Sequence, residues 1–321
     1  MEDLKSKEID ILRGIAVLGV IVGHTLQTKF FVIDGAFWVW IFFITSGFLQ
    51  AYYFRSGRYD LSFYGIKRYF LNRFLRIFPL FWLMLVFKIG LDLLLDHSIN
   101  WTQVFLNFFC CTSHYGILGS LWSISTEIQM YVVVPLIVFL MRKDLFWIFF
   151  CIFLLLVFKV IPVVDNPNQP REILGNLPIF CLGVLTAHIY PINFRINPYI
   201  KYIIMGIIFF ITLHILTHDI ESFWRIWGVR LAAVLAIFML LFQTTFSICN
   251  VLLRPVEFIG KYCYGIYVYA VLIGAIYSNF FNIKPGFYAF ILQMMAVPVA
   301  FISYHTFEQY FLRFKLKQQN K

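Results

Sequence analysis

The sequence predicts an all-α protein, a polytopic transmembrane bundle of about ten helices with both termini in the cytoplasm. Of its 321 residues, 61% are hydrophobic, 20% aromatic and 13% charged, and the mean hydropathy is +0.81. A soluble domain carries roughly a quarter charged residues and just under half apolar ones. One water-soluble core could not bury this much apolar surface. The composition therefore excludes an extracellular hydrolase, a nucleic-acid-binding domain and a disordered tail as the main body.

Ten apolar runs are long enough to cross a bilayer, whose core of about 30 Å takes about 20 helical residues. In chain order they cover residues 9–28, 36–54, 74–95, 121–141, 145–164, 174–190, 199–217, 225–243, 262–281 and 286–311. Pro, Gly, Asn and charged residues separate them, as in the segment 165–172. The segment 101–112 is apolar but too short to span, so we expect it to lie in the interface or to re-enter.

We find no internal repeat, low-complexity tract or soluble domain, and no signal-peptide pattern. The chain is therefore expected to form one transmembrane domain, residues 1–321, with Met1 as the first residue of the mature protein. A short basic tail, residues 312–321, is expected in the cytoplasm. Six Cys residues form no Cys-x-x-Cys pair and mostly lie in apolar runs, which indicates small buried side chains rather than disulfides or metal ligands.

The positions of the Lys and Arg residues predict the orientation. Eighteen of the 26 cations lie in segments that ten spans place on one side: the N-terminus, 55–73 with Arg76, 142–143, 195–201, 254–261 and the C-terminal tail. Only Lys29, Arg171, Arg225 and Lys284 lie on the other side. Because cytoplasmic loops carry the excess of cations, a multi-pass protein of the cytoplasmic (inner) membrane with cytoplasmic termini is predicted. The net charge of +10 then needs no nucleic-acid partner.

The first span carries two ionisable side chains, Arg13 and His24. They are 11 residues apart, which is about 16 Å of helix rise and about three turns, so they share a face at different depths. Asp10, three residues before Arg13, can hold its guanidinium on that face. Ionisable groups inside a span are costly and by default indicate a functional site. The alternative is a snorkelling arginine and an interfacial histidine.

The fourth span carries Glu127, about two turns inward from its outer end. That depth matches the one inferred for His24, so an imidazole and a carboxylate are predicted at one level of the bundle. Such a pair is suited to general-base chemistry, with the carboxylate orienting the imidazole. The alternative is a structural hydrogen bond between helices. Ser123, Ser125 and Gln129 could join either arrangement.

Arg73 and Arg76 lie three residues apart at the cytoplasmic start of the third span and therefore share a helix face. Paired guanidiniums bind phosphate groups through several charge-assisted hydrogen bonds. The alternative is that the two arginines set the topology and contact anionic lipid. Glu308, near the cytoplasmic end of the tenth span, lies at a depth similar to that of Arg13 and could form an ion pair with it.

Other polar positions have simpler interpretations. Ser46 and Gly47, in the middle of the second span, are small residues that permit close approach of helices. His214 and His218 are four residues apart and could ligate a metal, but an interfacial helix end is the favoured interpretation. No metal site is therefore predicted.

These pieces together resemble the acyltransferase-3 family, integral membrane O-acyltransferases that modify cell-surface glycans. The Arg-x10-His and Ser-x-Glu-x-Gln-x-Tyr elements are the most specific ones. In the order of the family, the matching segments are IDILRGIAVLGVIVGH (9–24), FFITSGFL (42–49), RFLRIFP (73–79), LWSISTEIQMYVVVPL (121–136) and SYHTFEQYF (303–311). The resemblance thus extends over nearly the whole chain.

The resemblance implies a ten-helix membrane core, an acyl-CoA donor from the cytoplasm, usually acetyl-CoA, and transfer to a sugar hydroxyl. It implies a catalytic role for His24, Glu127 and Arg13, and donor binding by Arg73 and Arg76. Acyl-CoA is a co-substrate, so no tightly bound cofactor is expected. Residues expected to support the site are Asp10, Ser46, Gly47, Trp122, Ser125, Gln129, Ser303 and Glu308.

The sequence departs from the family pattern in two places. Many members carry a histidine after the tyrosine motif of the ninth span, whereas residues 264–272 (YGIYVYAVL) contain none. Some members also carry a soluble SGNH-type esterase domain, and this sequence stops at Lys321. We therefore expect transfer to the final acceptor to be completed within the membrane domain or by a separate protein.

The expected function is O-acetyl transfer within the membrane to a polysaccharide or lipid-linked glycan. His24, oriented by Glu127, would deprotonate the acceptor hydroxyl or briefly carry the acyl group. Arg13, with Asp10 and Glu308, would shape the donor path. The leading alternative is a transporter or flippase for a glycan or an acyl-carrying substrate, which also places ionisable residues inside a bundle. Inverted repeats would favour that alternative, and the sequence has none.

Overall fold

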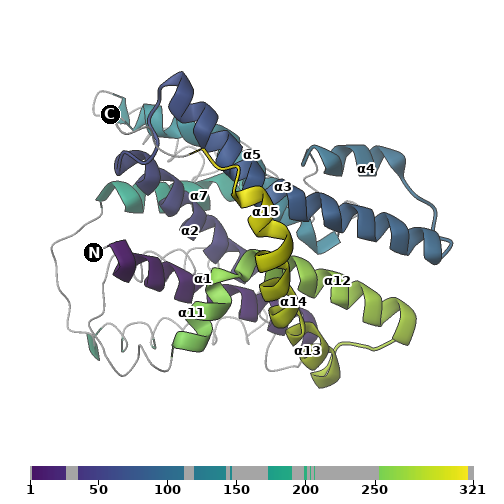
Figure 1. Ribbon diagram of the computed structural model, residues 1–321. Coiled ribbons are helices and arrows are strands. Elements are labelled where there is room, and N and C mark those ends of the chain that lie inside the picture. The colour runs from purple at the N-terminus through teal and green to yellow at the C-terminus, as the bar shows by residue number, and fades with distance from the viewer. Residues whose placement is uncertain are drawn as a thin grey trace. The chain divides into compact units, whose positions relative to one another are not determined.

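The computed structural model describes residues 2–26, 35–111, 119–141, 145–146, 173–189, 199–200, 203, 206 and 253–316. Every regular element within these residues is a helix (Figure 1). The predicted all-α class is therefore confirmed for the described part of the chain.

The helices differ widely in length, from a single turn to 32 residues. They are α1 (Glu2–Thr25), α2 (Gly35–Arg55), α3 (Phe63–Leu94), α4 (Trp101–Phe108), η1 (Gly119–Leu121), α5 (Trp122–Leu140), α7 (Ile173–Ile189), α11 (Arg254–Lys261), α12 (Cys263–Phe281), α13 (Phe287–Met294), α14 (Ala296–Ser303), η2 (Tyr304–Glu308) and α15 (Gln309–Leu312).

Within the described residues, four helical segments are long and apolar enough to cross a membrane: Phe63–Leu94, Trp122–Leu140, Cys263–Phe281 and Phe287–Leu312. They occupy the predicted third, fourth, ninth and tenth spans, while α1, α2 and α7 occupy the first, second and sixth. The predicted spans 145–164, 199–217 and 225–243 lie almost entirely outside the described residues. The total of ten spans stays a prediction.

The helix that contains the predicted span 74–95 begins earlier than that span, at Phe63. Ser62 caps it, since the Ser62 hydroxyl accepts a hydrogen bond from the Gly65 amide at 3.0 Å. The helix has 32 residues, or about 48 Å, which exceeds the roughly 30 Å of a bilayer core. Its first turns are therefore expected to extend beyond the hydrocarbon.

The last apolar segment is not one regular helix. It runs through α13, α14, the π-helical turn η2 and α15. Pro298, in the first turn of α14, has no amide hydrogen to continue the pattern from α13. The π-helical turn contains Glu308, and such turns occur frequently at functional sites.

The contacts divide the chain into two compact units: unit 1 contains residues 1–48 and 182–300, and unit 2 contains residues 49–181 and 301–321. In unit 1, α1 packs against α11 and α12 (Figure 1). A Cβ atom on Gly260 would lie 1.6 Å from the Asp10 carbonyl oxygen, and one on Gly14 would lie 2.1 Å from the Val256 carbonyl oxygen. These two glycines therefore let the backbones of α1 and α11 meet.

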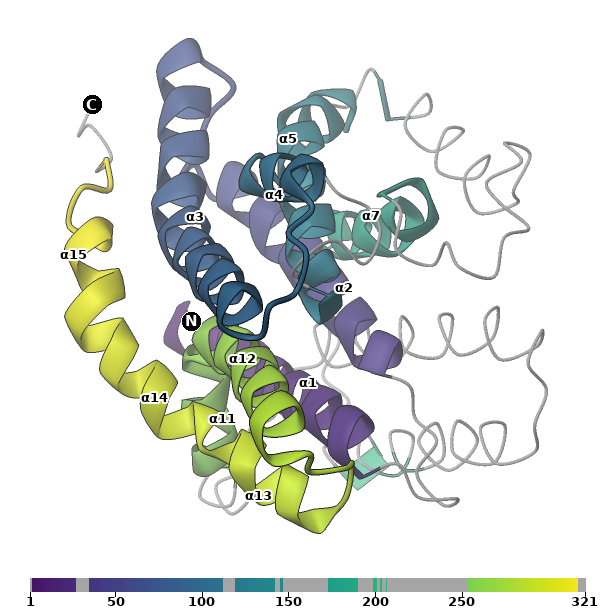
Figure 2. The same ribbon diagram turned by 90° about the vertical axis from the view of Figure 1, so that its right-hand side faces the viewer.

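In unit 2, α3 packs against α4, η2 and α15, and Figure 2 shows α4 beside α3. The buried Tyr69 of α3 donates its hydroxyl hydrogen to the Tyr131 carbonyl of α5 at 3.3 Å. Trp82 of α3 donates from Nε1 to the Phe108 carbonyl at 2.9 Å and stacks on its ring at 4.7 Å. Because α4 has only eight residues, or about 12 Å, it cannot span a bilayer.

Candidate functional site

In unit 1, Arg13 of α1 contacts the segment FFITSGFL (42–49) of α2. Its Nη2 donates to the Ser46 hydroxyl of α2 at 3.5 Å. Ser46 is only 1% exposed, so the contact lies in the interior of the unit. The sequence assigned Ser46 to packing, and the structure adds a hydrogen bond that orients the guanidinium. Gly47, next to it, is also buried.

His24 lies in the last turn of α1, and its side chain is exposed. The following residue, Thr25, is fully buried and bonds back to the Ile21 carbonyl at 2.7 Å. The imidazole thus lies exposed at the end of α1, next to a buried threonine. Asp10 lies near the other end of α1, beside α11, and its charge acts on Lys261. The Asp10–Arg13 pair stays a prediction.

In unit 2, a chain of contacts links Glu127 to Arg73. The Tyr131 hydroxyl donates to the Glu127 carboxylate, one turn away on α5. The Arg73 guanidinium lies 5.9 Å from the Tyr131 ring centroid and 5.6 Å from that of Tyr53. Two aromatic rings therefore hold the cationic plane of Arg73 by cation–π attraction.

Further cations surround Arg73. The Arg58 guanidinium lies 4.6 Å from the Tyr53 ring, and Arg68 donates to the Arg58 carbonyl. Lys315 lies close enough to Arg76, Arg73 and Arg58 for their charges to act on it. We name this group the basic cluster, with five members: Arg58, Arg68, Arg73, Arg76 and Lys315.

The basic cluster has far more positive than negative charge. Among the residues that the structure describes, no carboxylate lies within ion-pair distance of its members. Arg76 is the charged group that acts on the nearby Glu308 carboxylate. The Nε atoms of Arg68 and Arg73 are buried and have no hydrogen-bond partner. The cluster therefore offers directed N–H donors and unbalanced positive charge, which together suit a polyanion such as a phosphate ester.

The remaining supporting residues lie inside unit 2. Trp122, Ser125 and Ser303 are buried. Gln129 donates from Nε2 to the Cys110 carbonyl at 3.0 Å, which ties α5 to the segment after α4.

The sequence interpretation missed Gln50 of α2. Its side chain is fully buried in unit 2, and neither its amide nitrogen nor its amide oxygen has a hydrogen-bond partner. Gln50 precedes Tyr53 by three residues and thus shares its helix face, one turn from the ring that holds Arg73. A polar residue inside an apolar helix was the available signal.

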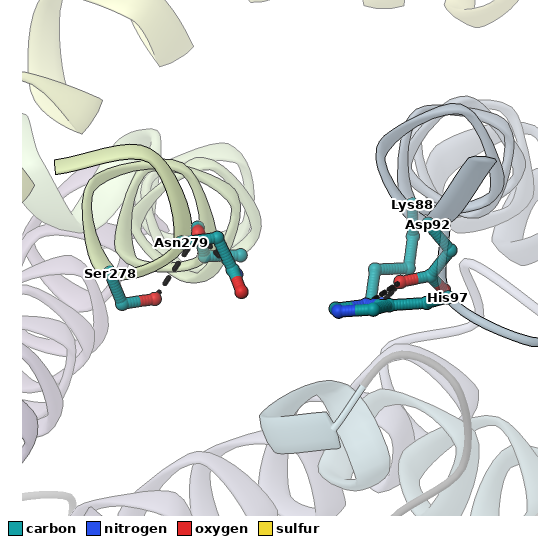
Figure 3. A network of polar contacts seen from close by, with 6 residues as sticks. Lys88, Asp92, His97, Ser278 and Asn279 are labelled. Atoms are coloured by element: carbon teal, nitrogen blue, oxygen red, sulfur yellow. Dashed lines mark hydrogen bonds and ion pairs between the residues drawn. The ribbon is translucent and has the colours of Figure 1, made fainter. Parts of the chain in front are cut away.

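A second polar group, also missed, lies at the far end of α3 (Figure 3). Lys88 pairs with the Asp92 carboxylate, and His97 Nδ1 lies 3.4 Å from the same carboxylate oxygen. The Lys88–Asp92 spacing of four residues is typical of a helical ion pair and could have been recognised. The His97 amide also donates to the Asp92 carbonyl at 2.9 Å, so the group closes the C-terminal end of the helix.

The structure thus brings together some of the predicted residues. Arg13 meets Ser46 in unit 1, and Arg73, Arg76 and Glu308 gather in unit 2. His24 belongs to unit 1 and Glu127 to unit 2, so their predicted approach stays a prediction, as does the pairing of Arg13 with Glu308. Within the described residues no group of three potential metal ligands occurs, and His214 and His218 lie outside them.

Comparison with known proteins identifies the family to which this chain is similar. Residues 6–305 match the family described as "Acyltransferase domain", Acyl_transf_3. Three relatives from Staphylococcus aureus strains COL, MSSA476 and N315, each named "Putative O-acetyltransferase", are 25% identical to the chain over 356 aligned positions. The alignments cover 97% of this chain but 58% of each relative, so the chain spans little more than half of their length. No solved structure gives a significant match.

Proposed function

The chain belongs to the acyltransferase-3 family, and from that membership we propose that it is a membrane O-acyltransferase. In this proposal it transfers an acyl group, acetyl in the first instance, from acyl-CoA to a hydroxyl of a cell-surface polysaccharide or a lipid-linked glycan. The name of the relatives supports acetyl as the transferred group. The four helices of membrane-spanning length support a location in the membrane, which we take to be the cytoplasmic one.

The basic cluster is the observation that carries the donor assignment. Coenzyme A carries a pyrophosphate and a phosphate monoester, and guanidinium groups recognise such oxygens through paired hydrogen bonds. Arg73 and Arg76 therefore hold the donor phosphates. Their unbalanced charge and the partnerless Nε atom of Arg73 support this role.

The acyl end of the donor extends away from the arginines along α2. Gln50 lies one turn from Tyr53 in that direction, and both the nitrogen and the oxygen of its side-chain amide are buried and unpaired. A buried polar group without a partner is costly, and a ligand amide can supply both the donor and the acceptor that Gln50 lacks. The pantetheine arm of coenzyme A contains such amides. The proposal also assigns Arg13, with Asp10 and Glu308, a role in shaping the donor path.

His24 supplies the base. In the direct route its unprotonated nitrogen removes the acceptor hydroxyl proton while the oxygen attacks the thioester carbonyl carbon. The carbon–sulfur bond breaks, and the departing thiolate takes the proton from the imidazolium. In the other route the imidazole attacks the thioester carbonyl carbon, the carbon–sulfur bond breaks, and the coenzyme A thiolate departs from an acyl-histidine. The acceptor hydroxyl then attacks that acyl group, the imidazole leaves, and the hydroxyl proton passes to the thiolate. Glu127 orients the imidazole in both routes.

The test combines donor binding with transfer. Full-length protein in membranes receives labelled acetyl-CoA, and both label in the glycan fraction and free coenzyme A thiol are measured. We expect His24→Ala to abolish transfer while expression and acetyl-CoA binding remain. Retained transfer in this variant would mean that the imidazole is not the base. Binding of acetyl-CoA with no thioester consumption by the wild type would favour a transporter instead.

A further inference from the structure

The Asn72 side chain of α3 bonds to the described part of the C-terminal tail, at Leu316. The Leu316 amide donates to the Asn72 carbonyl oxygen Oδ1 at 3.0 Å, and the Asn72 amide donates to the Leu316 carbonyl at 3.2 Å. Asn72 is 8% exposed and also donates to the Tyr59 hydroxyl at 3.2 Å. One amide side chain thus satisfies both backbone groups of a residue 244 positions away in the sequence. Paired bonds of this kind fix the position and the direction of the tail.

This docking places Lys315 in a region of like charge. Lys315 is the residue just before Leu316, it is partly buried, and Arg76, Arg73 and Arg58 act on its ammonium group. Burial, and then repulsion by these guanidiniums, lower the pKa of Lys315 to about 8. An ammonium kept among guanidiniums by the Asn72 bonds is unfavourable until an anion joins the group.

We propose that Lys315 is a donor-binding residue: docked on Asn72, the C-terminal tail supplies an ammonium group that contacts the phosphates of the acyl-CoA donor together with Arg73 and Arg76. The inference rests on the proposed function and extends its donor site by one cation and one positioning residue, Asn72. Basic tails commonly serve topology or bind anionic lipid. Lys315 differs from such a tail residue because two specific hydrogen bonds hold its neighbour in place.

The experiment measures acetyl-CoA affinity by calorimetry on the full chain purified in a neutral detergent. Lys315→Met is expected to weaken binding by about tenfold or more, which is typical for a hydrogen bond to a charged group. Lys67→Met is the matched control, because Lys67 is an exposed lysine of α3 outside the basic cluster. Its affinity is expected to stay within about twofold of the wild type.

Two further variants test the docking. Asn72→Leu removes the tail contact, and Leu316→Pro removes the amide hydrogen that Asn72 accepts while leaving the Asn72–Tyr59 bond in place. Each is expected to weaken acetyl-CoA binding as Lys315→Met does. Combining Leu316→Pro with Lys315→Met should add little further loss, because both changes remove the same contact. Full additivity of the two losses would overturn the positioning role.

The outcomes separate this inference from the proposed function. If the wild type does not bind acetyl-CoA, the donor assignment itself fails. If the wild type binds acetyl-CoA and both Lys315→Met and Lys67→Met bind it as tightly as the wild type, only the role of Lys315 fails. A third arm adds phosphatidylglycerol to the micelles. If Lys315→Met changes binding of that lipid but not of acetyl-CoA, the tail serves a lipid headgroup and the inference is overturned.

Discussion

At the residue scale, the two aromatic rings around Arg73 favour an arginine over a lysine at this position. Its guanidinium lies 5.6 Å from the Tyr53 ring and 5.9 Å from the Tyr131 ring. A planar guanidinium can stack on rings and still present paired N–H groups, whereas an ammonium is a compact point charge. We expect the double variant Arg73→Lys/Arg76→Lys to bind acetyl-CoA about tenfold or more weakly although both charges remain. Calorimetry in detergent measures this.

If the two arginines served only to orient the chain, lysine would replace them without loss, because the positive-inside rule counts charge and not shape. Equal affinity of the double variant and the wild type would therefore move the donor site away from Arg73 and Arg76. A salt titration of both proteins identifies any nonspecific attraction, which screening removes.

Lys315 predicts a pH dependence of donor binding. Burial, together with Arg76 and Arg73 of α3 and Arg58 of the preceding loop, lowers its pKa to about 8. Glu308 of η2 is the acidic group beside Arg76. The ammonium is present below this pKa and lost above it, so acetyl-CoA affinity should fall between about pH 7 and pH 9.

The matched variant is Lys315→Arg, whose guanidinium stays protonated over this range. Its acetyl-CoA affinity should change little between the same two pH values. A decline equally steep in both proteins would assign the pH dependence to another group.

Contacts between residues three or four apart on one helix could be predicted from the sequence. Contacts between residues far apart in the sequence could not. Arg73 and Arg76 were recognised because a separation of three places them on one helix face. Tyr131, four residues after Glu127, could have been found by the same rule. Lys315 and Asn72 could not, because the contact that places Lys315 joins positions 244 residues apart and leaves no local pattern.

At the element scale, the contact between α1 and α11 depends on the absence of a side chain. A Cβ atom on Gly260 would lie 1.6 Å from the Asp10 carbonyl oxygen, which is backbone and cannot rotate away. We expect Gly260→Ala to destabilise the protein by about 1–3 kcal/mol or more, since one helix must shift. Thermal unfolding in detergent, followed by fluorescence, measures the effect.

Gly90 of α3 provides the control for this change. It is also helical, but a Cβ atom there meets nothing within 4 Å. Alanine should be neutral or stabilising by up to about 1 kcal/mol, because it has the higher helix propensity. Destabilisation of both variants to the same extent would argue against a specific packing role for Gly260.

The boundaries of α3 show the limit of hydropathy as a guide to elements. The apolar half from residue 74 was predictable, whereas the stretch from Phe63 carries Lys67, Arg68 and Arg73 and lies outside the predicted span. That stretch is helical because Ser62 caps it and its amphipathic face packs inside unit 2. Packing of this kind depends on partners that a local window does not contain.

At the scale of the whole molecule, α3 defines a test of orientation. Gly57 precedes α3, Ser98 follows it, and both are exposed. The distribution of cations predicts that Gly57 is cytoplasmic and Ser98 external. After replacement of the native Cys residues, a membrane-impermeant thiol reagent should label Ser98→Cys in intact cells and Gly57→Cys only in permeabilised ones. The reverse pattern would contradict the orientation.

The membrane character was predictable at this scale because composition and hydropathy are properties of the whole chain. The order of the motifs also predicted the family, which the match over residues 6–305 confirms. The approach of His24 to Glu127 is a different kind of prediction. It depends on helix packing, which depth along two separate spans does not determine.

The bond between Asn72 and Leu316 also has a consequence for biosynthesis. Ribosomes add about 5–20 residues per second, so the 244 residues between the two partners take on the order of ten to fifty seconds to appear. Through that interval the nascent chain already contains Arg73 and Arg76 but not the tail that Asn72 holds. Assembly of the basic cluster is therefore a late event, and translation arrested before Lys315 yields a protein whose four arginines lack the fifth cation of the cluster.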